Sequence, residues 1–226
     1  MARRSDTKGA ISASGVSTAL LFVAALAMAW AWHSPFLFPL KILVVLMHES
    51  GHALGALLTG GRLLTISVGM DEGGQALTAG GSAFVTLNCG YLGSLAWGML
   101  LLTLTRGTRG GQGVSALLSV GLFVLTLGWI RPAFSFGFVY SMLAAVGFGV
   151  LARFSPGVNR IVLRSLGLFS VLYALADIVD DVLSRPGAPS DAAALSVLTG
   201  VPTLAWGVGW IVVSGLVLAL FRKRLV

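Results

Sequence analysis

Long apolar runs, separated by short stretches with Gly, Pro and Arg, dominate the pattern of this chain. Several runs reach the roughly 20 residues that a helix needs to cross about 30 Å of hydrocarbon. The pattern predicts an all-α polytopic membrane protein with six to seven transmembrane helices. The predicted spans are 16–32, 36–59, 82–104, 113–130, 133–152, 159–183 and 203–221. We expect the fourth and fifth spans, separated by "WIRPAF", to form a tight helical hairpin rather than one kinked helix.

Residues 62–81 interrupt the membrane pattern. Apolar and polar residues alternate from Leu64 to Val68, "DEGG" supplies turn residues, and 76–78 can return as a second strand. The segment predicts a β-hairpin inserted between the second and third spans of a single integral membrane domain, 1–226. Because an isolated two-stranded hairpin is marginal in water, it should lean on the membrane surface or on other spans.

Composition agrees with a membrane protein. Of the 226 residues, 56% are hydrophobic and 10% are charged, and the mean hydropathy is +0.92; such values lie outside the range of soluble domains. The net charge is +7, but Arg and Lys lie at predicted span ends, where anionic lipid headgroups explain them better than nucleic acid does. We expect membrane lipid, and no nucleic acid, as a partner.

The first predicted span contains Ala27-Met28-Ala29, which is similar to a signal-peptide cleavage site. Apolar sequence continues through Trp30 and Trp32. We therefore favour a retained anchor. The basic residues are spread almost evenly over the two sides of the predicted bundle, so they do not decide its orientation.

The second predicted span, "VVLMHESGHALGA", carries His48, Glu49 and His52. Two histidines four apart on a helix project from one face and can hold a single metal ion. Glu49 is then close enough to take a proton from a water on that metal, which is the HExxH arrangement of zinc hydrolases. The alternative is a histidine pair satisfied by hydrogen bonds across the bundle, with Glu49 neutral. Ionisable residues at membrane depth usually mark function, so we favour zinc.

A hydrolytic zinc site usually has a third protein ligand. At 1.5 Å rise per residue, His52 lies about 12 Å inside the exit of its span, Asp177 about 10 Å and Asp181 about 4 Å. Asp181 also has Arg185 one turn onward as a partner. These depths rank Asp177 first as the ligand, Asp181 second and Asp180 third.

Other polar positions receive ordinary interpretations. Asp71 and Glu72 are expected to be solvated charges in the hairpin turn. Asn88 is expected to form hydrogen bonds with a substrate backbone or a neighbouring helix. Small residues at 90, 94 and 98 share a helix face and favour close helix packing. The segment "SRPGAPSDAAA", 184–194, is interpreted as a short low-complexity segment.

The blocks "HESGHALGALLTGGRLLTISVGMDEGG", "GYLGS", "DIVDD", "SDAAALSVLTGVP" and "WGVGW" resemble the small bacterial and plant membrane proteins grouped as site-2-protease-like zinc metallopeptidases. The resemblance covers residues 44 to 210. It implies an intramembrane metalloprotease fold, with His48 and His52 as ligands, Glu49 as catalytic acid/base and an aspartate from a later span. Better-known members carry that aspartate in an Asp-Gly motif after Leu or in an Asn-Pro stretch, whereas this chain has Asp177-Ile178 and Asp181-Val182.

The expected function is therefore a zinc endopeptidase that hydrolyses a transmembrane or membrane-proximal peptide bond. Its partners would be lipid, a membrane-spanning substrate and other membrane subunits. The resemblance implies a multi-pass protein of the bacterial inner membrane, with the hairpin side facing the cytoplasm. The alternative is a non-catalytic scaffold or complex subunit that keeps the protease-like fold. A transporter is a weaker third hypothesis, because the polar groups gather near one side of the membrane.

Overall fold

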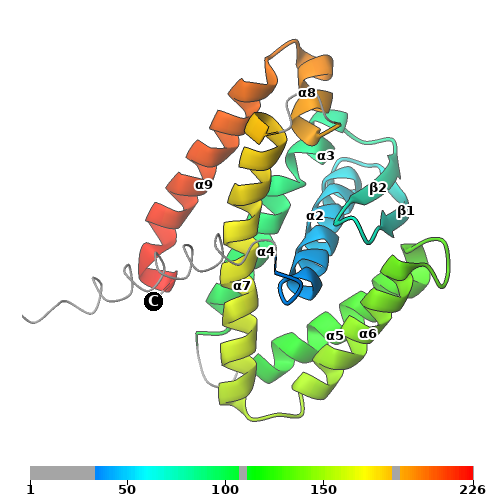
Figure 1. Ribbon diagram of the computed structural model, residues 1–226, viewed down its shortest axis with the longest axis vertical. Helices are drawn as coiled ribbons and strands as arrows, with labels where there is room; N and C mark the ends of the chain where they lie inside the picture. The colour runs from blue at the N-terminus through cyan, green and yellow to red at the C-terminus, as the bar shows by residue number, and fades with distance from the viewer. Residues whose placement is uncertain (1–33, 107–110, 185–188, 226) are drawn as a thin grey trace, which may run out of the picture. The chain divides into compact units, whose positions relative to one another are not determined.

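The helices of this chain begin and end close to the predicted spans. The computed structural model describes residues 34–106, 111–184 and 189–225 (Figure 1). The predicted first span, 16–32, and the cleavage-like segment within it lie outside the described residues. All the elements discussed belong to Phe38–Leu225, which is one unit. They are α2 (Phe38–Leu58), β1 (Arg62–Val68), β2 (Gly74–Ala79), α3 (Ala83–Asn88), α4 (Tyr91–Leu104), α5 (Gly111–Trp129), α6 (Phe136–Leu151), α7 (Pro156–Val179), the π-helical turn η1 (Asp180–Ser184), α8 (Asp191–Thr199) and α9 (Thr203–Leu225).

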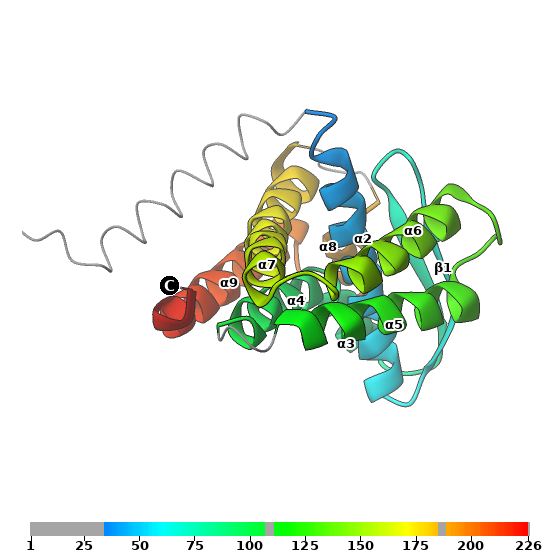
Figure 2. The same cartoon turned by 90° about the horizontal axis from the view of Figure 1, so that it is seen from below.

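Four helical segments of the described chain are long and apolar enough to cross a membrane. They are α2, α5, α7 continued by η1, and α9, while α4 and α6 are apolar but shorter. The fold is therefore mostly helical, as predicted, and has four candidate spans; the total of six to seven stays a prediction. Helices α5 and α6 lie side by side as two helices joined by a short connection, which confirms the predicted helical hairpin (Figure 2).

The predicted span 82–104 is wrong in one respect, because it is divided in two. Helix α3 begins after Ser82, whose Oγ accepts a hydrogen bond from the Val85 amide, and ends at Asn88. Cys89 and Gly90 then separate α3 from α4. With 14 residues, α4 is about 21 Å long, which is less than the roughly 30 Å of a bilayer core. The division brings irregular backbone against the C-terminal half of α2.

Two glycines let α2 approach this divided segment. A Cβ on Gly51 would overlap the carbonyl oxygen of Cys89, and a Cβ on Gly55 would lie 2.9 Å from the Cys89 Sγ. The backbones therefore touch where larger side chains would separate them. Both glycines belong to the "HESGHALG" segment, so the local sequence that carries the histidines also allows the contact.

Small residues serve the packing of α4 on α7. A Cβ on Gly98 would lie 2.7 Å from the Gly167 carbonyl oxygen, and Ser170 Oγ donates a hydrogen bond of 2.9 Å to the Ser94 carbonyl oxygen. These contacts confirm the packing interpretation of positions 94 and 98. Gly90, on the same predicted stripe, has a different environment, described below.

The predicted β-hairpin is confirmed as an antiparallel pair in which Ile66 lies opposite Ala76 and Val68 opposite Gly74. Both strands pack against α2, and Ile66 also bridges to Ile130 in the connection between α5 and α6. The expectation that the hairpin leans on other spans is therefore correct. The outer edge of β1 is partly occupied by this connection, whereas β2 pairs with β1 alone among the described strands.

Replacing Gly51 by alanine is expected to destabilise the protein, because the new Cβ would meet the Cys89 backbone. Overpacking of this kind typically costs about 1–3 kcal/mol of the free energy of unfolding. Gly121→Ala is the matched control, since a Cβ there meets nothing within 4 Å. Thermal unfolding in detergent should give a lower Tm for G51A than for G121A, and equal values would contradict the close contact.

Candidate metal centre

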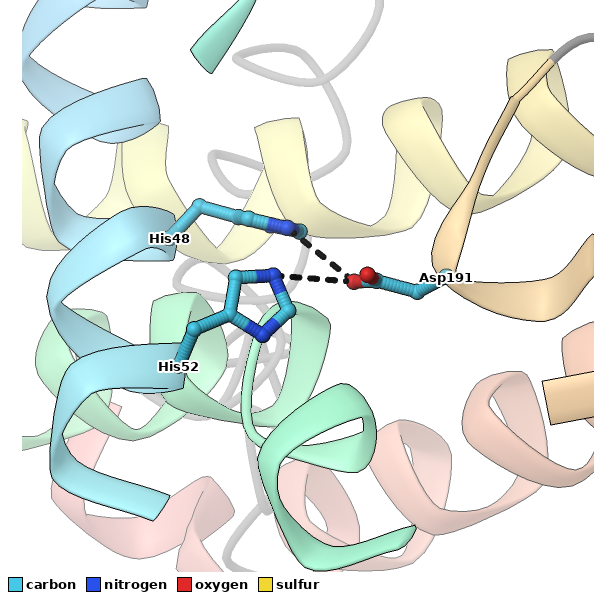
Figure 3. A group of neighbouring side chains, drawn as sticks. All are labelled: His48, His52 and Asp191. Carbon is cyan, nitrogen blue, oxygen red and sulfur yellow. Dashed lines mark ion pairs between the residues drawn. The ribbon is translucent and has the colours of Figure 1, made fainter. Parts of the chain in front are cut away.

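Two histidines of α2 converge on one aspartate of α8. His48 Nε2 and His52 Nε2 each lie 3.2 Å from Asp191 Oδ2, and the ligand atoms of the three residues lie within 4.8 Å of one another (Figure 3). Ligand atoms on a tetrahedral zinc ion, with bonds of about 2.1 Å, are about 3.4 Å apart. The observed group therefore has the residue types and the spacing of a zinc site.

Asp191 is held in place by the start of α8. Ser190 caps this helix, with its Oγ accepting a hydrogen bond from the Ala193 amide. Ala192 and Leu195 are fully buried in a cluster with the Tyr91 side chain. Asp191 lies in the first turn, where the helix dipole favours a negative charge. Burial opposes the charged form, but hydrogen bonds and charges from the two histidines lower the pKa of Asp191 to about 2, so the group is a carboxylate at neutral pH.

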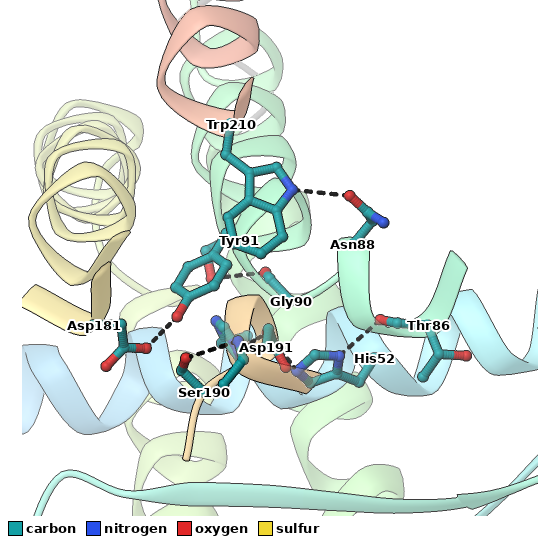
Figure 4. Close-up of polar contacts among 12 residues, drawn as sticks. His52, Thr86, Asn88, Gly90, Tyr91, Asp181, Ser190, Asp191 and Trp210 are labelled. Atoms are coloured by element: carbon teal, nitrogen blue, oxygen red, sulfur yellow. Dashed lines mark hydrogen bonds and ion pairs between the residues drawn. The ribbon is translucent and has the colours of Figure 1, made fainter. Parts of the chain in front are cut away.

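The orientation of His52 is set from its other ring nitrogen. Nδ1 donates a hydrogen bond of 2.8 Å to the Thr86 carbonyl oxygen of α3 (Figure 4). Such a bond is the usual outer contact of a metal-ligating histidine, because it leaves the Nε2 lone pair available. A nitrogen lone pair facing a carboxylate oxygen is repulsive unless a cation lies between them. Either protons on the rings or one shared metal ion can supply this charge.

Gly90 leaves the point of convergence open. A Cβ on this residue would lie 2.5 Å from His48 Nε2 and 2.6 Å from His52 Cε1, and would also contact Asp191 Oδ2. Apart from the two histidines, Asp191 Oδ2 has no polar partner among the described residues. The three residues thus surround a space lined by donor atoms, and they fit a zinc ion.

Glu49 lies between this group and the β-hairpin. Its side chain is buried, with 4% exposed, and its carboxylate accepts a hydrogen bond from the Ala76 amide of β2. Gly74 also lies against it, since a Cβ there would meet the Glu49 carboxylate and Val45. Among the described residues, Glu49 Oε2 has no hydrogen-bond partner. One carboxylate oxygen is therefore available for a proton.

The geometry groups the histidines with a different carboxylate from the predicted one, and Asp177 as a zinc ligand stays a prediction. Asp191, and not Asp177, Asp181 or Asp180, completes the compact group. Asp181 instead accepts a hydrogen bond from the Tyr91 hydroxyl, and the charge of Asp177 acts on His48. The depth comparison considered only aspartates within a span, whereas Asp191 lies on α8, which follows α7 and η1.

Tyr91 connects Asp181 of η1 to His48 of α2. Its side chain is buried, with 2% exposed, and its ring meets the His48 ring edge-on at a centroid distance of 4.9 Å. The bond to Asp181 holds the hydroxyl of this ring. Asp181 therefore supports the position of the His48 ring through Tyr91.

Asp191 was missed because 184–194 was interpreted as a low-complexity segment. A local signal was present. Ser190 precedes an acidic residue and the apolar run "AAALSVL", which is the pattern of a capped helix that buries one face. That pattern would have predicted α8 and placed an aspartate at its first turn.

The structure confirms some of the interpretations of the remaining polar residues and corrects one. Asn88 accepts a hydrogen bond of 2.9 Å from Trp210 Nε1 of α9, which confirms the predicted contact with a neighbouring helix (Figure 4). Asp71 accepts a hydrogen bond from the Gly73 amide within the turn. Glu72 is not merely a solvated charge, as predicted, because it pairs with Lys41 of α2.

The fold and this site are those of a helical membrane protein with a candidate metal centre. A family model for Peptidase M50B-like proteins matches residues 21–221. The chain belongs to the Peptidase M50B-like family, which confirms the resemblance to site-2-protease-like peptidases. Metallopeptidases of this kind depend on a metal. Searches of curated proteins and of solved structures found no match.

Asp191→Asn is expected to weaken zinc binding much more than Asp177→Asn. Loss of an outer partner of a metal ligand already costs about 10–100-fold in affinity, so loss of a ligand should cost at least about 100-fold. Zinc content and competition with a chelator, measured on both purified variants, test this expectation. Zinc retained by D191N and lost by D177N would restore the sequence-based choice of Asp177.

Gly90→Ala is expected to lower zinc content while leaving the fold intact, because the added methyl group would occupy the space between the donor atoms. Gly147→Ala is the control, since a Cβ at that position meets nothing within 4 Å. Zinc analysis and thermal unfolding should be compared for the two variants. A G90A protein with native zinc content would argue against a metal ion at this point.

Proposed function

We propose that the protein is an intramembrane zinc metalloprotease that hydrolyses a transmembrane or membrane-proximal peptide bond. The convergence of His48, His52 and Asp191 beside the buried Glu49 carries the proposal. These three residues would hold zinc, with Glu49 as acid/base. When bound, zinc supplies a Lewis acid that activates water and polarises the scissile carbonyl group. Family membership and four candidate membrane spans support the same assignment.

Glu49 performs the proton transfer in this mechanism. The Ala76 amide engages its carboxylate and fixes the direction of the group, while Oε2 is available to take the proton of the attacking water and deliver it to the leaving amine. Burial keeps bulk water from competing for this proton. Thr86 and Tyr91 keep the two histidine rings in place, so that catalysis needs no rearrangement of the ligands.

The β-hairpin supplies a binding edge for the substrate. A helical substrate hides its amides, so its backbone must unwind before cleavage. Strand β2 contacts Glu49 through Gly74 and Ala76, and an extended peptide pairing with its edge would lie beside the site. We expect polar or glycine-rich stretches of a substrate to be cut best, because they unwind at the smallest cost.

The proposed environment is the bacterial inner membrane, with the chain crossing it several times. Membrane lipid surrounds the apolar helices, whose outward side chains are largely exposed on α5 and α9. The substrate is a membrane-spanning peptide or protein. Other membrane subunits are further proposed partners.

Glu49→Gln is expected to abolish peptide hydrolysis, because glutamine has the same shape and cannot accept the proton. Loss of general-base catalysis alone costs about 10²–10⁴-fold in rate. Zinc content should stay native, since Glu49 is not among the proposed ligands, whereas His48→Ala should lose both zinc and activity. Cleavage of a detergent-solubilised transmembrane substrate and zinc analysis give the two readouts.

Full peptidase activity in E49Q would contradict this mechanism. A native protein that contains no zinc, and whose His48→Ala variant folds and supports the same cellular role, would establish the non-catalytic scaffold instead.

A further inference from the structure

A buried lysine on α2 anchors the turn of the β-hairpin. Lys41 has 4% of its surface exposed, and its Nζ donates hydrogen bonds of 3.0 Å and 3.2 Å to the two carboxylate oxygens of Glu72. A charged group inside a membrane helix is costly unless it is paired. The ion pair therefore links α2 to the turn in a geometry that both charges require.

The backbone conformation of the turn directs the Glu72 carboxylate toward Lys41. Glu72 has φ +63°, a left-handed conformation that a residue with a Cβ adopts only where the surroundings hold it. Around it, the Gly69 amide bonds to the Gly73 carbonyl oxygen, and the Gly73 amide bonds to Asp71 Oδ1. The strained backbone of Glu72 is therefore held in a conformation that directs its side chain to Lys41. We infer that this ion pair helps to fix the position of the turn.

Three contacts align the hairpin along one face of α2. Lys41, Val45 and Glu49 are spaced by four residues and thus share a helix face. Glu72 binds the first of these residues, and Gly74 lies against the other two. The Ala76 amide then reaches Glu49. Over eight residues of helix, about 12 Å, β2 follows α2 from the ion pair to the acid/base.

We propose that Lys41 and Glu72 are positioning residues, forming a latch that sets where β2 lies over Glu49. The latch touches neither the substrate nor the metal group, and it acts through the Ala76 amide and through the strand edge that receives the peptide. The effect of the latch on catalysis rests on the proposed function. The effect of the latch on the position of the hairpin is independent of that function.

The latch is tested with Lys41→Met, Glu72→Gln and the exchanged pair K41E/E72K. The matched control is Asp71→Asn, which removes an acidic charge from the adjacent turn position but keeps the oxygen that binds Gly73. Hydrogen exchange of the backbone amides of 69–79, followed in detergent, measures the hairpin without reference to catalysis. We expect exchange at least about tenfold faster in K41M and E72Q than in D71N, and slower exchange again in K41E/E72K.

The kinetic readout separates positioning from ligation. In K41M and E72Q, kcat for a peptide substrate should fall roughly tenfold to a hundredfold, as misplacement near a reacting group does, while zinc content stays native. The exchanged pair should recover part of this loss. Glu72 is partly exposed in the turn, so E72Q keeps the test valid where K41M fails to fold.

Exchange rates and kinetics of K41M and E72Q equal to those of D71N would overturn the latch. A native protein without peptidase activity would refute the proposed function instead, and the exchange rates would still decide whether Lys41 and Glu72 hold the hairpin.

Discussion

The convergence of two histidines and one aspartate on a single point is the interaction on which the rest of this structure depends. His48, His52 and Asp191 meet within 4.8 Å of one another, and no more than 16% of any of these side chains is exposed. Convergence requires that α2 touch irregular backbone, and Gly51 permits that contact. It also requires that no side chain enter the shared space, and Gly90 meets that requirement. The division of the third predicted span thus places Cys89 and Gly90 where both requirements are met.

Helix α2 connects the chemistry to the binding edge. One of its faces carries the histidines, and an adjacent face carries Lys41 and Glu49, which contact the hairpin turn and β2. Each buried charge on this helix has a partner from another element, so burial and pairing position both halves of the site. A single rigid helix can in this way keep a catalytic group, its ligands and a substrate strand in fixed relation.

Apolar run lengths predicted most of the elements, because hydropathy responds to a lipid environment along a whole helix. Alternation predicted the hairpin, since its two faces differ in burial. The division at Cys89 and Gly90 escaped prediction because both residues suit an apolar run, and only their contact with α2 explains it. Helix α8 escaped because nine residues are too few for a span, although its Ser190 cap and apolar face were visible in the sequence.

The sequence by itself determined the part of the site that lies on one helix. His48 and His52 are four residues apart, so helical geometry alone places both rings on one face with Glu49 beside them. Only the tertiary structure decided which carboxylate meets the two histidines. Asp177 and Asp191 are both more than a hundred residues away in sequence, and the path of the chain after η1 brings Asp191 of α8 to the histidines. The same holds for Glu72, whose partner Lys41 is a neighbour in space alone. Local periodicity fixes directions within an element, whereas contacts between elements depend on the path of the chain.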